Sequence, residues 1–165
     1  MAATSMDKHI LKILEDDARV TPSEIAVRLG KTKKEVSEAI KRLERDGVIR
    51  RYKAIIDWEK AGREQVFAFI DVRVTPSRGV GFDEVARRIY QYPEVHSVYL
   101  VSGDYDVRVV VEGKSMRDVA FFVAERLATL EGVLSTKTNF MLKKYKTDGD
   151  IFEESAQDAR LAVTP

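Results

Sequence analysis

Basic side chains gather in one short segment of this chain, residues 31–53. The segment holds nine Lys or Arg and four Asp or Glu, which leaves a local charge of +5. The whole chain of 165 residues is nearly balanced, with 28 basic and 27 acidic side chains. A concentrated positive charge of this kind can bind the phosphates of a nucleic acid, because it releases the counterions that surround the polyanion.

Two local sequence patterns predict the helices that position these side chains. Thr21 and Glu24 have the spacing of a capping box, and Thr32 and Glu35 repeat it. Gly30, between the two patterns, suits the left-handed turn that ends a helix. Two helices joined by so short a turn predict a helix-turn-helix, with a first helix at about 6–16 in front of it.

The second of these helices has one apolar side and one polar side. Val36, Ile40 and Leu43 recur at helical spacing and predict a buried face. In a helix-turn-helix the start of the second helix meets base edges, and later basic residues contact phosphates. The predicted DNA-binding residues are Lys31, Thr32, Lys33, Lys34, Ser37, Glu38, Lys41, Arg42, Arg45, Arg50 and Arg51, of which Lys41 and the arginines are assigned to phosphates. The alternative is an ordinary solvated helix face with charges paired along it.

The composition narrows the other possibilities. The chain has no Cys and only two His, which excludes a disulfide scaffold and a thiolate metal site. No carboxylate spacing predicts a metal site, and we expect no cofactor. No apolar run is long enough to span a bilayer, so the expected protein is soluble and cytoplasmic, without a membrane partner.

The second half alternates strands and helices. Strands are predicted at 66–74, 95–101, 107–111 and 133–145, and helices at 82–92 and 115–130. The order strand, helix, strand, strand, helix, strand predicts a ferredoxin-like βαββαβ sandwich, so the chain as a whole is α+β.

These patterns divide the chain into four parts. We expect a winged helix-turn-helix domain at 1–52, a linker at 53–64, the ferredoxin-like domain at 65–146 and an acidic tail at 147–165. Residues 48–57 are expected to form a strand or short hairpin beside the helices. The tail is expected to be disordered or a short peripheral helix.

A sandwich with both helices on one side leaves the other face of its sheet uncovered. That face is expected to carry Phe67, Phe69, and Val98 or its neighbours. An apolar sheet face needs a cover, and a second copy of the chain is the simplest one. A homodimer is therefore expected.

Three stretches carry a resemblance to a known family. They are VSEAIKRLERDGVIRRYKAIID at 36–57, LVSGDYDV at 100–107 and LEGVLSTKTNFMLKKYK at 130–146. Together with the order of elements, they resemble the Lrp/AsnC ("feast/famine") transcription regulators over most of the chain, from Met6 to about Tyr145. The resemblance implies a DNA-binding regulator that assembles from dimers into tetramers or octamers and responds to a small effector, usually an amino acid.

The resemblance also implies where the effector binds. The matching positions are Ser102, Gly103, Asp104, Tyr105, Asp106, Thr136, Thr138 and Asn139. Gly103 would let a carboxylate approach backbone N–H groups, and Asp104 or Asp106 could bind an ammonium. The alternative is that Gly103–Asp106 is only a hairpin turn, since these residue types are common in turns.

Two other function classes remain open. Siroheme decarboxylases are similar to this family in both halves, so the fold does not exclude an enzyme. In this chain only His96 could take part in such chemistry, and we therefore expect no enzymatic activity. A helix-turn-helix that contacts another protein is the third possibility.

Overall fold

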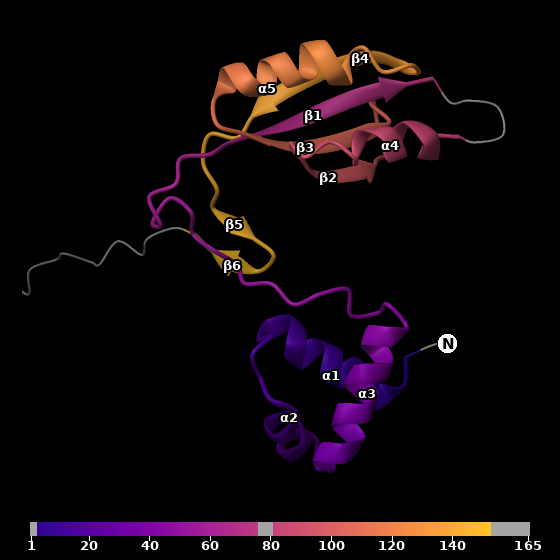
Figure 1. Cartoon of the computed structure of the whole chain (residues 1–165), viewed down its shortest axis with the longest axis vertical. Helices are drawn as coiled ribbons and strands as arrows, with labels where there is room; N and C mark the ends of the chain where they lie inside the picture. The colour runs from indigo at the N-terminus through magenta and orange to yellow at the C-terminus, as the bar shows by residue number, and fades with distance from the viewer. Residues whose placement is uncertain (1–2, 76–80, 153–165) are drawn as a thin grey trace, which may run out of the picture. The chain divides into compact units, whose positions relative to one another are not determined.

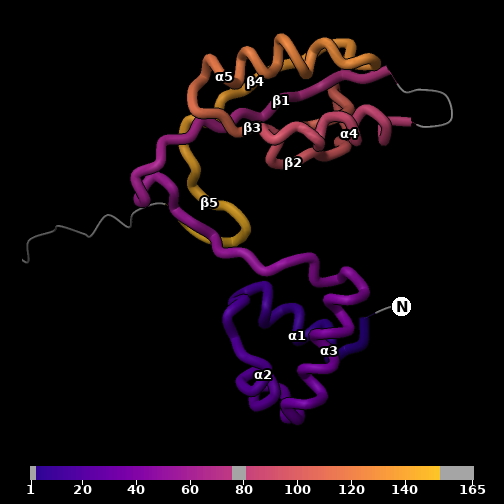
Figure 2. Tube along the Cα trace, viewed as in Figure 1, coloured from indigo at the N-terminus to yellow at the C-terminus, as the bar shows by residue number. Residues whose placement is uncertain are grey.

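The computed structural model describes residues 3–75 and 81–152, and the chain divides into two compact units (Figures 1 and 2). The first unit is Met1–Ile56 and the second is Asp57–Pro165. The division lies inside the segment predicted as a linker, 53–64. Nothing in the described part of the chain is a helix long and apolar enough to cross a membrane.

Helices α1 (Ser5–Asp16), α2 (Pro22–Leu29) and α3 (Lys33–Arg45) form the first unit. Each helix is capped by a threonine whose hydroxyl accepts a hydrogen bond from the backbone N–H three residues on. The carboxylate of that third residue accepts a hydrogen bond from the backbone N–H of the threonine. The pairs are Thr4 with Asp7, Thr21 with Glu24 and Thr32 with Glu35. Gly30 ends α2 in the left-handed conformation, with φ of 61°. The predicted capping boxes and the turn between α2 and α3 are therefore confirmed.

A small apolar core joins these helices. Ile10 of α1, Ile25 of α2 and Val36 of α3 have no exposed surface, and Ala39 and Ile40 complete the contact. α3 thus turns one side inward, as the spacing of its apolar residues predicted.

The strand or hairpin predicted at 48–57 is wrong. Ile49 packs against the helix core, but no described residue between Arg45 and Val66 lies in a strand. Residues 50–56 are exposed. A strand needs a neighbour to pair with, and this segment finds none within its own chain.

The second unit holds a four-stranded antiparallel sheet in the order β2-β3-β1-β4. The strands are β1 (Val66–Val74), β2 (Val95–Leu100), β3 (Val107–Gly113) and β4 (Val133–Phe140). Helix α4 (Asp83–Ile89) follows β1, and helix α5 (Met116–Phe122), continued by the π-helical turn η1 (Val123–Leu127), precedes β4. This is the predicted ferredoxin-like order (Figure 1).

One face of this sheet forms the core and the other lies open. Ala68, Ile70 and Val72 of β1 are fully buried and pack in one cluster with side chains of α4, α5 and η1. The alternate residues Phe67 and Phe69 lie on the open face, as predicted, because successive strand residues point to opposite sides. Of the alternatives Val98 or a neighbour, the neighbour is correct, since Val98 itself packs against the core. Its neighbour Tyr99 lies on the open face, opposite Arg108.

The chain after β4 differs from the prediction. β4 ends at Phe140 rather than 145, because its last partner on β1 is Ala68 and only one further backbone bond, from Met141 to Phe67, follows. Strands β5 (Lys146–Thr147) and β6 (Asp150–Ile151) then form a hairpin, where a disordered or helical tail was predicted. Asp148 and Gly149 turn it with positive φ, and the Asp-Gly pair is the sequence signal that could have revealed it. Residues 153–165 of the predicted tail lie outside the described residues.

Candidate functional site

The polar side of α3 presents exposed basic side chains. Lys33, Lys34 and Lys41 are exposed, as are Glu38 between them and Lys31 in the preceding turn, while Ser37 is half-buried. The opposite side of the helix is closed by the core. These side chains share one accessible surface that a long polyanion can follow.

Two of the predicted DNA-binding residues have partners within the unit. The Thr32 hydroxyl accepts from the Glu35 backbone at 3.2 Å and donates to the Glu35 carboxylate at 2.7 Å. Arg42 donates to the carboxylate of Asp7 on α1 at 2.5 Å. Thr32 therefore starts the helix, and Arg42 holds α3 against α1. Sequence reasoning missed the second role, because the two residues lie 35 positions apart.

The remaining predicted arginines lie at and beyond the end of α3. Arg45 donates to its neighbour Asp46, and Arg50 and Arg51 are exposed on the segment that follows. Tyr52 next to them donates a hydrogen bond to Glu44 at 2.9 Å. Burial and this bond raise the pKa of Tyr52 to about 12. The start of the linker is therefore held to α3 through an un-ionised hydroxyl.

The predicted effector turn packs against the end of β1. The backbone N–H of Val74 donates to the Asp106 carboxylate at 2.8 Å, and Arg73 donates to the carbonyl of Asp104 at 2.7 Å. The Arg73 guanidinium also lies over the ring of Tyr105, 5.6 Å from its centroid. Ser102, Gly103 and Asp104 are exposed at the tip. A Cβ at Gly103 would meet no atom within 4 Å, so space is open beside the turn.

The predicted effector residues on β4 are divided between the two faces of the sheet. Thr136 and Thr138 pair with Val72 and Ile70 and share the helix-covered face with them. Asn139 lies on the open face, where its amide donates to the Asp71 carboxylate at 3.3 Å. The structure therefore brings Thr136 to the same end of the sheet as the turn, and does not bring Asn139 into that group.

Asp71 is a central residue of the open face that sequence reasoning missed. It is buried, and Arg108 of β3 donates to it at 2.7 Å. This bond raises the pKa of Arg108. His96, the residue considered for tetrapyrrole chemistry, lies edge-on against Phe67 and 4.0 Å from Glu112. Within the ranges that the structure describes, no cluster of His, Asp and Glu is placed to hold a metal ion.

Comparison with known proteins identifies both units. The Lrp/AsnC ligand binding domain matches residues 67–151, and a winged helix-turn-helix DNA-binding domain matches residues 4–50. The uncharacterized HTH-type transcriptional regulator YugG of Bacillus subtilis is 52% identical over 166 residues, covering 100% of both chains.

Solved structures agree with this assignment. The leucine response regulatory protein LrpA of Mycobacterium tuberculosis is 28% identical, with a TM-score of 0.74 over 89% of this chain and 97% of that one. A transcriptional regulator of Neisseria meningitidis, solved as a complex with L-Met, is 25% identical, with a TM-score of 0.72 over 88% and 94%. With a DNA-binding helix-turn-helix in its first unit and a ligand-binding domain in its second, the chain belongs to the Lrp/AsnC family of transcriptional regulators.

Proposed function

We propose that the protein binds double-stranded DNA with sequence preference by placing α3 in the major groove. The single observation that carries this proposal is the arrangement of α3, whose exposed side carries Lys33, Lys34 and Lys41 while its other side is core. A helix supported in this way can enter the groove without losing its own packing. A regulator of this kind acts on the chromosome, so we place it in the cytoplasm.

The side chains of this surface divide by chemistry. Lys31, Lys33, Lys34, Ser37 and Glu38 lie at the start of α3 and are assigned to base edges. Lys41, Arg45, Arg50 and Arg51 follow and are assigned to phosphates, which fix position rather than sequence. We do not assign Thr32 and Arg42 to DNA contacts, because Thr32 caps α3 and Arg42 donates to Asp7.

Selection of bound fragments from random DNA, followed by fluorescence anisotropy at several salt concentrations, tests the proposal. Each phosphate contact adds about −0.9 to the slope of log affinity against log salt. Replacing Lys41 by Gln should make the slope less steep by the amount of about one phosphate contact and should weaken binding to all DNA sequences alike. Binding that is independent of salt would contradict the major-groove interface.

The second unit is proposed to bind an amino acid that tunes DNA binding or assembly. The match to a ligand-binding domain supports this, as does the L-Met complex of the related Neisseria regulator. We place the effector at the exposed tip Ser102–Asp104, at the end of the sheet where Thr136 also lies. A ligand shifts an equilibrium only by its different affinity for the two states, so an effect of about 1–3 kcal/mol is expected.

Titration calorimetry of the full chain with each of the twenty amino acids tests the effector. The expected result is heat with one or a few of them and a matching change in DNA affinity. If none gives heat or shifts the melting temperature, the effector proposal is wrong, while the DNA-binding proposal stands on its own measurement.

The open sheet face supports self-association. Phe69 and Tyr99 expose 36% and 54% of their surface there, around the buried pair of Asp71 and Arg108. We expect a second copy to cover this face in a dimer that can assemble further. Phe69→Asp should give monomers in analytical ultracentrifugation. Leu142→Asp is the matched control, because Leu142 is 91% exposed but lies after the end of β4.

A further inference from the structure

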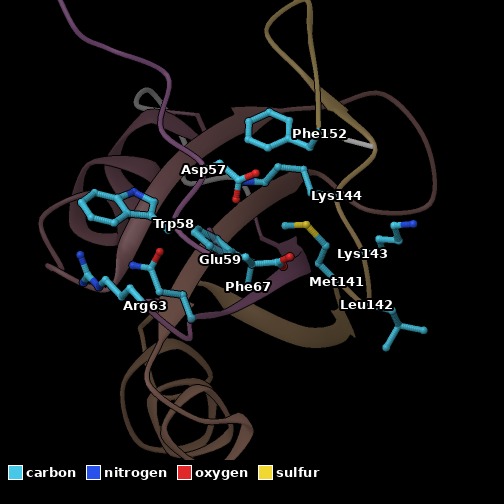
Figure 3. Close-up of a pocket in the computed structure, with 11 residues that line it drawn as sticks. Asp57, Trp58, Glu59, Arg63, Phe67, Met141, Leu142, Lys143, Lys144 and Phe152 are labelled. Atoms are coloured by element: carbon cyan, nitrogen blue, oxygen red, sulfur yellow. The ribbon is translucent and has the colours of Figure 1, made fainter. Parts of the chain in front are cut away.

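A pocket of about 130 Å³ lies in the second unit, at the start of β1 (Figure 3). Its walls come from the turn 57–63, from the beginning of β1 and from the segment 141–144 that follows β4. Phe67, in this pocket, and Arg73, at the effector turn, are six residues apart on one strand. Six residues of strand span about 20 Å, so the pocket is a separate place from that turn.

Aromatic rings and cations meet in this pocket. The Arg63 guanidinium lies over the ring of Trp58, 5.1 Å from its centroid. The Lys144 ammonium lies 5.2 Å from the ring centroid of Phe67 and 4.9 Å from that of Phe152. The acids Asp57 and Glu59 line the pocket as well, and Arg63 donates to Glu112 at 3.4 Å, so Lys144 between the two rings is the main cation for a ligand. Rings that hold a cation in this way offer flat apolar walls beside positive charge. A carboxylate attached to a flat apolar body matches both features.

A buried acceptor adds a third requirement. The amide nitrogen of Gln65 donates to the carboxylate of Glu112, which can only accept. In this orientation of the amide, its oxygen Oε1 is buried without a hydrogen-bond partner in the described structure. A buried acceptor without a donor is costly, so a ligand that brings an N–H or O–H group here gains affinity.

We propose that this pocket binds a small aromatic carboxylate that also carries a hydrogen-bond donor. The carboxylate meets Lys144 and Arg63, the ring lies among Trp58 and Phe67, and the donor reaches Gln65. The volume of about 130 Å³ suits one aromatic ring, because a protein cavity of about 150 Å³ takes up benzene, and the carboxylate and the donor lie at the edge of that ring. This site is independent of the proposed effector turn, and it requires no DNA for its test.

The chain supplies its own reporter and control. Trp58 is the only tryptophan, so its fluorescence reports on this pocket alone. Lys146 is the matched control for Lys144, because it lies two residues further along the chain, is exposed and does not line the pocket, whereas Lys143 lines it with its ammonium pointing away from the rings (Figure 3).

Titration of the full-length protein with three probes, followed by Trp58 fluorescence and calorimetry, tests the proposal. The probes are 4-hydroxybenzoate, benzoate, which lacks the hydroxyl donor, and benzyl alcohol, which lacks the carboxylate. The expected order of affinity is 4-hydroxybenzoate, then benzoate, then benzyl alcohol. No saturable signal from any of them, or equal binding of all three, would overturn the assignment.

Substitutions then assign each contact. Lys144→Met keeps the apolar stem and should weaken the binding of 4-hydroxybenzoate about tenfold or more, whereas Lys146→Met should leave it unchanged. Arg63→Gln should weaken the binding of both carboxylate probes, 4-hydroxybenzoate and benzoate. It replaces Lys144→Met in this test if that variant does not fold. Gln65→Met should abolish the preference for 4-hydroxybenzoate over benzoate. If the Lys144 and Lys146 variants bind alike, the carboxylate does not bind here and the proposal fails.

Discussion

Arg42 of α3 donates a hydrogen bond to Asp7 of α1, with Nη2 2.5 Å from Oδ1. The other oxygen of Asp7 accepts from the backbone of Thr4 at 2.8 Å, so one carboxylate starts α1 and holds α3. Burial raises the pKa of Asp7, but the bonds from Thr4 and Arg42 outweigh burial, and the pKa is lowered. The Asp7 carboxylate is therefore charged at neutral pH, and Arg42 supplies the positive charge that pairs with it.

Replacing Arg42 by Gln should destabilise the first unit. The Asp7 side chain is 3% exposed, and its charge would lose the guanidinium, while half-exposed Arg42 limits the cost. We expect a loss of about 1–3 kcal/mol in the free energy of unfolding, measured by urea denaturation.

The same variant separates packing from DNA contact. Arg42→Gln should leave the salt slope of DNA binding unchanged, whereas Arg45→Gln should reduce it by about 0.9 with little change in stability. Arg45 is the matched control because it occupies the same helix and its side chain is 74% exposed. A reduced slope for Arg42→Gln would return Arg42 to the phosphate contacts.

Acid should weaken the first unit through its helix caps. The pKa of Glu24 is lowered mainly by the hydroxyl of Thr21 and that of Glu35 by the hydroxyl of Thr32, and the pKa of Asp7 is lowered as well. A carboxyl whose pKa is lower in the folded than in the unfolded state stabilises the fold at pH values above its pKa in the unfolded chain. This stability is lost as the pH falls through the pKa of the folded state. Their ordinary values are 4.5 for the two Glu and 3.8 for Asp7, so the decline should begin below about pH 4.5.

Circular dichroism melting between pH 2 and pH 7 measures this decline. The double variant Thr21→Ala with Thr32→Ala should lose about 1 kcal/mol per cap at neutral pH and show a shallower acid decline. An unchanged acid profile in that variant would mean that other carboxyls cause the decline.

The two aspartates of the effector turn should separate by function. Asp106 accepts from the backbone of Val74, so Asp106→Ala should cost about 1–2 kcal/mol of stability by leaving a partly buried N–H unpaired. Asp104 has its side chain exposed at the tip, and only its backbone carbonyl bonds to Arg73. Asp104→Ala should therefore weaken amino-acid binding with little change in melting temperature. Loss of stability in Asp104→Ala instead would favour a purely structural turn.

Gly113 at the end of β3 is a close approach that only glycine permits. A Cβ at this position would lie 2.8 Å from Cγ2 of Val119 on α5. Gly113→Ala should destabilise the second unit by about 1–3 kcal/mol in thermal denaturation. Combined with Val119→Ala, which removes that methyl, the cost should be smaller than the sum of the two single costs. Additive costs would show that the strand moves away from α5 instead.

Local patterns in the sequence predicted the parts of this fold that depend on neighbours in the chain. The caps at Thr21 and Thr32 and the turn at Gly30 need only residues three or four positions away. The order of strands and helices along the second half of the chain followed from hydrophobic periodicity, and it indicated the ferredoxin-like pattern. The Asp-Gly turn at 148–149 was equally local, and its signal was available but not used.

Interactions between distant residues could not be predicted in this way. The bond from Arg42 to Asp7 depends on how α3 crosses α1. The expected strand at 48–57 failed because pairing needs a partner as well as suitable residues. The grouping of Thr138 with Asn139 was wrong for a simpler reason, since adjacent strand residues point to opposite faces.

The bond between Tyr52 and Glu44 has a consequence for the operators that a dimer can read. Residues 50–56 would form a tether of about 25 Å if fully extended, but holding Tyr52 against α3 leaves only residues 53–56, about 14 Å. A shorter tether raises the effective concentration of the second helix-turn-helix at a half-site within reach and excludes half-sites beyond it. Tyr52→Phe should therefore relax the spacing between half-sites that the protein accepts, while the bases preferred within each half-site stay the same.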